Sequence, residues 1–146
     1  MKIAIKKLTD TAQLPTQGST QAAGYDVYAN LPEEPVIINP GEVQLIPTGI
    51  STAPENADVA LCLFPRSGLA TKHGVTLVNS IGLVDSDYRG EIKVPLINHG
   101  HFPVTIKDGD RIAQLVVLAI TRAQFEEVAD LSDTDRGSGG FGSTGI

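Results

Sequence analysis

The chain is divided into short apolar segments that stop at turn residues, and this division restricts the fold more than any other feature of the sequence. The segments are rich in Val and Ile and are separated by Gly, Pro, Asn and Asp. They are KIAIK (2–6), VII (36–38), VQLI (43–46), VALCLF (59–64), VTLV (75–78), EIKVPLIN (91–98) and QLVVLAI (114–120). No stretch sustains the three- and four-residue apolar spacing of a helix. The sequence therefore predicts an all-β fold, a jelly-roll sandwich or barrel of short strands.

One short helix and one terminal arm interrupt this β pattern. SGLATKHG begins with Ser67, a residue type that caps helix N-termini, and ends with Gly74, which stops helices. Pro95 lies inside a strand segment. Because proline has no N–H to donate, this strand is expected at a sheet edge or a bulge. From about residue 131 the apolar pattern gives way to Ser, Asp, Thr and Gly, so we expect a β domain over 1–130 and a flexible arm over 131–146.

Composition and charge exclude several classes of protein. The 146 residues are enough for one domain with a buried core. The net charge of −6 argues against a general affinity for nucleic-acid phosphates. The single cysteine, Cys62, excludes an internal disulfide and fits a reducing compartment. With no apolar run of transmembrane length and no signal-peptide core near Met1, we expect a cytoplasmic protein without a membrane or nucleic-acid partner.

The arm ends in RGSGGFGSTGI (136–146), a segment that is too rich in glycine to hold one conformation alone. It matches the G-x-G-x-x-G pattern, but a dinucleotide fold requires a helix after that pattern and the sequence stops too soon. A disordered terminus would explain the glycines. It would not explain Arg136 and Phe141, which favour a lid whose arginine neutralises an anion and whose ring stacks on a flat group.

Two other stretches carry polar groups where an anion can bind. PRSGLA (65–70) places Arg66 before a helix N-terminus, where free N–H groups and the helix dipole favour an anion. An ordinary helix cap beside a surface arginine explains this stretch equally well. DGDRIAQL (108–115) is typical of a turn that enters a strand, but a turn does not explain Gln114 inside an apolar run.

The densest group of polar residues is GLVDSDYRGEI (82–92), which contains Asp85, Asp87, Tyr88 and Arg89. A turn between two hairpin strands accounts for Asp87. A carboxylate such as Asp85 is also suited to accept a proton in catalysis.

These stretches, with one more near the N-terminus, resemble the five motifs of the homotrimeric dUTPases, enzymes that hydrolyse dUTP to dUMP and pyrophosphate. In order they are AAGYDVYA (22–29), PRSGLA (65–70), NSIGLVDSDYRGEI (79–92), GDRIAQL (109–115) and RGSGGFGSTG (136–145). One such motif is weak, whereas five in the right order and spacing are specific. The resemblance implies a homotrimer that uses Mg²⁺, keeps uracil out of DNA and supplies dUMP for dTMP synthesis.

The resemblance also implies a role for each matched residue. Asp85 corresponds to the base that activates the attacking water, and Asp26 to the carboxylate that holds Mg²⁺ through its water shell. Tyr88 corresponds to the ring under the deoxyribose, where a ribose 2′-OH would collide. The residues that match phosphate ligands are Arg66, Ser67, Gly68 and Gln114. Those that match the uracil hairpin are Asn79, Gly82, Leu83, Val84, Asp85 and Lys93.

The arm matches the family's lid, which reaches a neighbouring subunit's site. Its matched residues are Arg136, Phe141, Gly142, Ser143 and Thr144. The resemblance places the arginine and hydroxyls on phosphates and the ring over the uracil face.

Two alternative functions are considered. The dCTP deaminases are similar in fold but use a catalytic glutamate shortly after the third motif, where this chain has Val94 and Pro95. A jelly roll that binds a nucleotide or a protein without turnover is the other alternative, and Asp85 together with the complete fifth motif argues against it.

Overall fold

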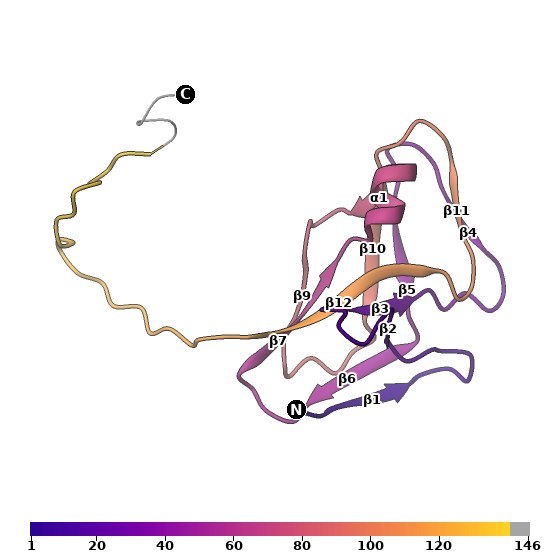
Figure 1. Cartoon of the computed structure of the whole chain (residues 1–146), viewed down its shortest axis with the longest axis horizontal. Coiled ribbons are helices and arrows are strands. Elements are labelled where there is room, and N and C mark those ends of the chain that lie inside the picture. The colour runs from indigo at the N-terminus through magenta and orange to yellow at the C-terminus, as the bar shows by residue number, and fades with distance from the viewer. Residues whose placement is uncertain (141–146) are drawn as a thin grey trace.

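The computed structural model describes residues 1–140, which form a β-rich body with one short helix and an extended arm (Figure 1). The elements are β1 (Ile3–Lys7), β2 (Thr16–Gln17), β3 (Tyr25–Tyr28), β4 (Val36–Ile38), β5 (Val43–Pro47), β6 (Ile50–Pro54), β7 (Val59–Phe64), α1 (Ser67–His73), β8 (Val75–Leu77), β9 (Gly82–Val84), β10 (Lys93–Asn98), β11 (Val104–Ile106) and β12 (Arg111–Ala119). Each of the seven predicted strand segments overlaps one of these strands. The all-β prediction is confirmed.

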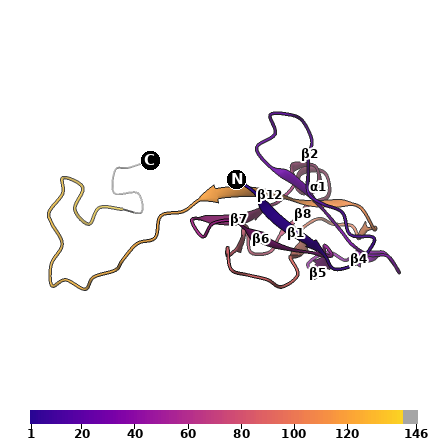
Figure 2. The same cartoon turned by 90° about the horizontal axis from the view of Figure 1, so that it is seen from below.

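The strands form antiparallel sheets that pack around one apolar core. The largest sheet has the order β2-β3-β12-β7-β9, and a second has the order β5-β10-β8. Two smaller pairs, β1-β6 and β11-β4, complete the body (Figures 1 and 2). Strand β7 is almost entirely buried, and its Leu61 and Leu63 join Val94 and Leu96 of β10 in the core. This arrangement is the predicted jelly roll.

The helix α1 begins one residue earlier than its predicted cap would place it. Arg66 is the N-cap, with φ −89° and ψ 128°, and no side chain among the described residues caps the helix. Ser67 is already the first helical residue, so its prediction as N-cap is wrong. Its carbonyl oxygen accepts a hydrogen bond from the Thr71 hydroxyl at 2.6 Å. Gly74 ends the helix as predicted, in the left-handed conformation with φ 71°.

The C-terminal end of α1 is fixed by a close approach of two backbones. A Cβ on Gly74 would lie 2.5 Å from the Gly100 nitrogen, and a Cβ on Gly100 would lie 2.4 Å from the His73 carbonyl oxygen. The Gly74 carbonyl also accepts a hydrogen bond from the His99 N–H at 2.9 Å. No residue of α1 is fully buried, although Leu69 packs against the core, and this contact holds the C-terminal end of the helix against the loop that follows β10.

Strand β10, which contains Pro95, is the central strand of its sheet, so the prediction of an edge or a bulge is wrong. The Pro95 carbonyl accepts a hydrogen bond from Val78 N–H at 3.0 Å. In an antiparallel strand, the N–H and C=O of one residue point to the same neighbour. The missing N–H therefore faces Val78, the residue after β8 ends, and the proline shortens the β8 ladder without interrupting it.

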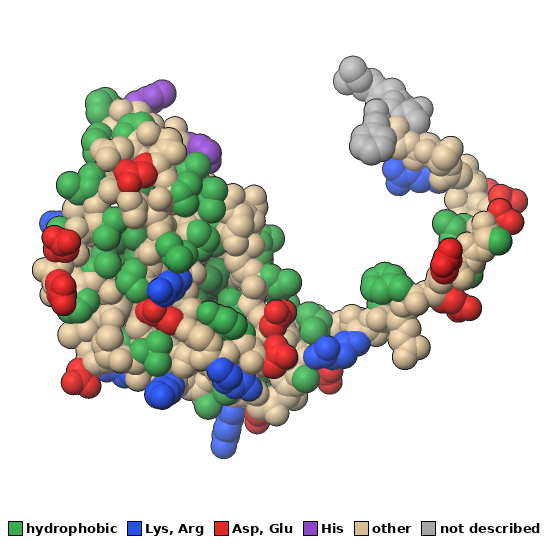
Figure 3. All heavy atoms as spheres, turned by 180° about the vertical axis from the view of Figure 1, so that it is seen from behind, with side chains coloured by type: hydrophobic (Ala, Val, Ile, Leu, Met, Phe, Trp, Pro, Cys, Tyr) green, Lys and Arg blue, Asp and Glu red, His purple; other side chains and the backbone are tan. Residues whose placement is uncertain are grey.

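Beyond β12 the chain leaves the body as an arm, defined here as residues 120–140 of the described structure (Figures 1 and 2). Phe125 is 98% exposed and Leu131 is 86% exposed. Figure 3 shows the arm as a separate strip that carries acidic side chains. Among residues 1–140, no helix is long and apolar enough to cross a membrane.

Candidate active site

One end of the large sheet brings together the residues expected to bind phosphate. Gln114 on β12 pairs with Asp26 on β3 and with Phe64, the last residue of β7. Arg66 follows β7 after one residue, so its side chain starts at the same end of the sheet. Three segments that are distant in the sequence thus meet here, and the antiparallel register is what aligns them.

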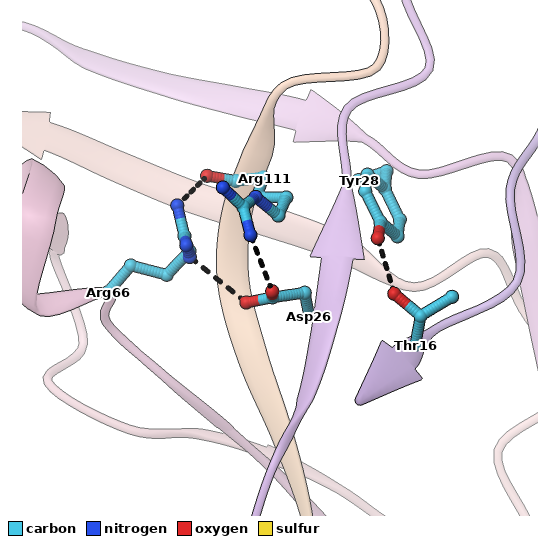
Figure 4. Close-up of polar contacts among 5 residues, drawn as sticks. All are labelled: Thr16, Asp26, Tyr28, Arg66 and Arg111. Atoms are coloured by element: carbon cyan, nitrogen blue, oxygen red, sulfur yellow. Dashed lines mark hydrogen bonds and ion pairs between the residues drawn. The ribbon is translucent and has the colours of Figure 1, made fainter. Parts of the chain in front are cut away.

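Asp26 is buried and forms two ion pairs (Figure 4). Its Oδ1 accepts a hydrogen bond from Arg66 Nε at 3.0 Å, and its Oδ2 accepts one from Arg111 Nη1 at 3.3 Å. Arg66 Nη1 also donates to the Arg111 carbonyl oxygen at 3.2 Å. A buried carboxylate is stable only when its charge is paired in this way. We call Asp26, Arg66 and Arg111 the arginine cluster.

Ser67 and Gly68 lie next to the arginine cluster, in the first turn of α1. Both residues are exposed, and a Cβ on Gly68 would meet no atom of residues 1–140 within 4 Å. The first N–H groups of a helix have no partner within the helix, so they are free to bind an anion. The open space around Gly68 leaves room for one to approach.

Three of the residues expected to bind the nucleoside, Val84, Tyr88 and Lys93, line a hollow at another part of the body. The hollow has a volume of about 410 Å³. It is lined by Leu45, Val84, Tyr88, Glu91, Ile92 and Lys93. Tyr88 is 46% exposed, and its hydroxyl donates to the Glu91 carbonyl oxygen at 3.2 Å. A half-exposed ring held by its own hydroxyl offers a flat apolar surface to a ligand.

Asp85 stands at the start of the turn between β9 and β10. It is exposed, and its carbonyl oxygen accepts a hydrogen bond from Tyr88 N–H at 3.1 Å. Within residues 1–140 its carboxylate forms no ion pair. Arg89 holds the turn in place, because its Nη1 donates to the carbonyl oxygens of Ser86 and Tyr88 at 2.8 and 3.1 Å. The turn thus presents a free carboxylate on a fixed backbone.

The remaining residues of the predicted hairpin lie in and around β9. Gly82 is buried against Leu63, Leu83 is 66% exposed, and Asn79 is exposed in the turn before the strand. Lys93 Nζ lies 3.5 Å from the Glu91 carboxylate. The structure therefore places Lys93 beside Tyr88 and Val84 at the hollow.

The two groups of residues are well separated within one chain. On β7, Phe64 pairs with Gln114, whereas Leu61, three residues before Phe64, pairs with Val84. Asp85 follows Val84 and so lies still farther from the Phe64 end of β7. Because β12 and β9 flank opposite sides of β7, Asp85 and Gln114 are at least about 10 Å apart along the strands and about 10 Å apart across them. One chain therefore does not bring Asp85 next to the arginine cluster.

The arm does not approach either group in this structure (Figure 1). Arg136 is exposed, and its Nε donates to the Gly139 carbonyl oxygen at 2.9 Å. The other predicted residues of the lid, Phe141, Gly142, Ser143 and Thr144, lie outside the described residues.

Two charged residues at these sites were not predicted from the sequence, and neither were the apolar Leu45 and Ile92 of the hollow. Arg111 belongs to the arginine cluster, and Glu91 lines the hollow and pairs with Lys93. Both lie inside stretches that the motifs cover. Neither has a sequence signal of its own, because a charged residue next to a turn is usually solvated surface.

The chain is similar to known proteins along almost its whole length. The dUTPase family model matches residues 10–145. Two similar proteins, both named deoxyuridine 5′-triphosphate nucleotidohydrolase, come from Nautilia profundicola and Caldanaerobacter subterraneus. The first is 50% identical and covers 99% of each chain. The second is 52% identical over 99% of this chain and 97% of its own.

Solved structures show the same fold. A dUTPase variant of Staphylococcus bacteriophage 80alpha with dUpNHpp is 25% identical, with a TM-score of 0.87 and 99% of each chain covered. A dUTPase variant from phage phi11 of S. aureus, described for its coordination of a structural Mg(II) ion, has a TM-score of 0.80. It is 21% identical and covers 91% of this chain and all of its own. The family model and the whole-length identities lead to one conclusion: the chain belongs to the dUTPase family.

Proposed function

We propose that this protein hydrolyses dUTP to dUMP and pyrophosphate by attack of water on the α-phosphate. The observation that carries the proposal is the pair of half-sites in a member of this family. One half is an arginine cluster suited to phosphates. The other is a hollow lined by Val84 and the half-exposed ring of Tyr88, and the exposed Asp85 directly follows Val84 in the chain. In the cell this activity would keep uracil out of DNA and supply dUMP for dTMP synthesis. The protein would act in the cytoplasm.

Asp85 is the proposed general base. An exposed carboxylate without a cationic partner among the described residues is free to accept a proton from water. The Arg89 hydrogen bonds fix the turn, so the carboxylate holds the water at one position. Proton transfer to Asp85 as the water attacks lowers the barrier, and the bond from the α-phosphate to the leaving pyrophosphate then breaks.

The hollow binds the uridine. Tyr88 supports the deoxyribose from below, and a ribose 2′-OH would collide with its ring. Asn79, Lys93 and the backbone of Gly82, Leu83 and Val84 contact the uracil edge, where backbone N–H and C=O groups distinguish one pyrimidine from another.

The phosphates bind at the arginine cluster. Arg66 supplies a guanidinium, and Ser67, Gly68 and Gln114 supply N–H and side-chain donors around it. The lid adds Arg136, Ser143 and Thr144 on phosphates, with Phe141 and Gly142 over the uracil. Closing such a lid expels water that would otherwise compete for the groups that bind the substrate, and it orients the substrate.

Magnesium fits this site only as a partner of the substrate. Within residues 1–140, no three acidic, histidine or cysteine side chains come together as metal ligands. Both oxygens of Asp26 already accept hydrogen bonds from arginines, so Asp26 would contact a metal only through its water shell. Mg²⁺ commonly binds to substrate phosphates and keeps several waters. When bound, it would neutralise charge on the phosphates.

A complete site requires more than one copy of the chain. Asp85 and the arginine cluster are too far apart in one chain to act on the same phosphate group. The arm leaves the body instead of folding back on it. We therefore propose a homotrimer in which each site combines the hollow of one subunit, the arginine cluster of another and the arm of a third.

The test is pyrophosphate release from dUTP with Mg²⁺, compared with dCTP, dTTP and UTP. We expect rapid release from dUTP alone. Ammonia release from dCTP would indicate a deaminase, although the buried Val94 and the adjacent Pro95 provide no catalytic carboxylate. Tight binding of dUTP without turnover would indicate a binding module. Either result would refute the proposal.

A further inference from the structure

The three members of the arginine cluster form a closed ring of contacts (Figure 4). Arg66 contacts the carboxylate of Asp26, Asp26 contacts the guanidinium of Arg111, and the backbone of Arg111 contacts Arg66 again. Two of the three nitrogens of the Arg66 guanidinium, Nε and Nη1, are held in this way. Its third nitrogen, Nη2, makes no hydrogen bond to residues 1–140. The ring thus leaves one nitrogen of this guanidinium without a partner among residues 1–140, where it can donate to a ligand.

Arg111 joins the ring because of a β-bulge. Ala113 pairs with Val27 and Arg111 pairs with Tyr28, so β12 has one more residue than β3 over this interval. The bulge lets the adjacent Ile112 and Ala113 both reach the core, where each is 0% exposed. It therefore changes the side-chain alternation and places Arg111 on the face of Gln114 and Asp26. Bulges near active sites commonly redirect a side chain in this manner.

We propose that Arg111 is a positioning residue for the triphosphate: it orients Asp26, and through Asp26 and its own carbonyl it fixes the guanidinium of Arg66 toward the phosphates. This inference rests on the proposed function of Arg66 as a phosphate ligand. The Arg111 side chain is 52% exposed, so its loss leaves no buried charge of its own. Loss of the Arg111 side chain removes the only charged partner that the described residues provide for Asp26 Oδ2.

The ring predicts a specific pattern of losses. Without the Arg111 side chain, the Asp26 carboxylate keeps only Arg66 as a charged partner among residues 1–140, so its orientation is less fixed. Arg66 keeps its hydrogen bond to the backbone carbonyl of residue 111, but its other partner, Asp26, is held less firmly. Because a hydrogen bond between charged groups accounts for roughly a 10- to 100-fold effect, we expect Arg111→Gln to weaken binding of dUpNHpp about tenfold or more. The KM for dUTP should rise by a similar factor while kcat changes less than about threefold. Binding of dUMP, which lacks the β- and γ-phosphates, should stay unchanged.

The control variants separate orientation from general attraction between charges. Lys107→Gln removes one positive charge from the exposed turn just before β12, and it should leave dUpNHpp binding unchanged. Arg111→Lys keeps a charge that can reach Asp26, and it should restore most of the affinity. Circular dichroism and elution volume check that each variant is folded and assembled.

The decisive measurement is a double-mutant cycle by calorimetry with dUpNHpp. If the ring acts as a unit, adding Arg111→Gln to Asp26→Asn should weaken binding less than about twofold further. Additive losses would overturn the proposal, because Arg111 would then attract phosphates independently of Asp26. An equal loss of dUMP affinity, or the same loss in Lys107→Gln, would also overturn it. Turnover of dUTP by the unmodified protein tests the proposed function separately from this comparison.

Discussion

An arm that serves a neighbouring subunit should allow two inactive variants to restore each other. The first variant carries Asp85→Asn with a complete arm, and the second keeps Asp85 but is truncated after Asp135. From Ala119 to Arg136 the chain can span roughly 55 Å when extended, at about 3.3 Å per residue, which is enough to cross to another subunit. Each variant alone should have almost no activity, because the first lacks the base and the second lacks Arg136 and Phe141.

The expected recovery follows from how the subunits mix. The two variants are unfolded together in equal amounts and refolded, so each position in a trimer is filled at random. A site is complete when its Asp85 donor is the truncated variant and its arm donor is the other variant. If these donors are different subunits, each condition is met half of the time, and about a quarter of the sites should be active.

Steady-state pyrophosphate release measures this recovery, and native mass spectrometry confirms that mixed trimers have formed. The separately refolded variants are the baseline. If the arm served only its own subunit, no site in any mixture would combine an intact Asp85 with a complete arm. Activity that stays at the baseline in confirmed mixed trimers would refute the crossed arm.

Four further outcomes are expected. Asp85→Asn should lower kcat roughly 10²- to 10⁴-fold while dUpNHpp affinity is kept, since the amide cannot accept the proton; near-normal turnover would remove Asp85 from the mechanism. Tyr88→Ala should raise the ratio of UTP to dUTP turnover about tenfold by making room for the 2′-OH, and an unchanged ratio would place sugar selection elsewhere. Asp26→Asn should lower the free energy of unfolding in urea by about 2 kcal/mol at fixed protein concentration, because a buried carboxylate loses its charge beside two arginines; equal stability would contradict the ion pairs. Burial raises the pKa of the Cys62 thiol, so iodoacetamide should label it only on unfolding, and rapid labelling of the native protein would show that the core opens.

The sequence predicts strands well where apolar residues dominate them. Segments such as 59–64 and 114–120 became β7 and β12 because burial of their side chains decides their conformation. Strand β6 (Ile50–Pro54) was not predicted, since Ser51 and Thr52 interrupt the apolar pattern by which strands were recognised. These two residues are nonetheless 7% and 3% exposed. Their backbone pairs with β1, a distant partner that local sequence does not reveal.

The end of the body was also harder to predict than its strands. Within residues 1–140 the last strand ends at Ala119, although the sequence retains apolar residues such as Phe125 and Val128 up to the predicted boundary at residue 131. Composition alone does not distinguish a strand of the body from an arm that carries apolar side chains into solvent. The domain boundary at 131 stays a prediction.

In the candidate site, too, residues within a local motif could be predicted, whereas a role that depends on contacts between distant segments could not. Motifs indicated Arg66, Asp85 and Tyr88 because each lies in a distinctive stretch. The role of Arg111 depends on a bulge and on a carboxylate 85 positions away in the sequence, and both emerge only when β3 and β12 pair. The proline at 95 failed as an edge signal for a similar reason, because the end of β8 rather than the edge of the sheet accommodates it.

The backbone contact between Gly74 and Gly100 determines which substitutions this region tolerates. Because α1 has no buried side chain, most single changes along its exposed face should leave the fold intact, within about 0.5 kcal/mol. Neither glycine can gain even one methyl group without moving a backbone. A library that randomises positions 71–74 and 100 should therefore accept many residues at the exposed positions 71–73, while glycine alone survives selection at the two contact positions.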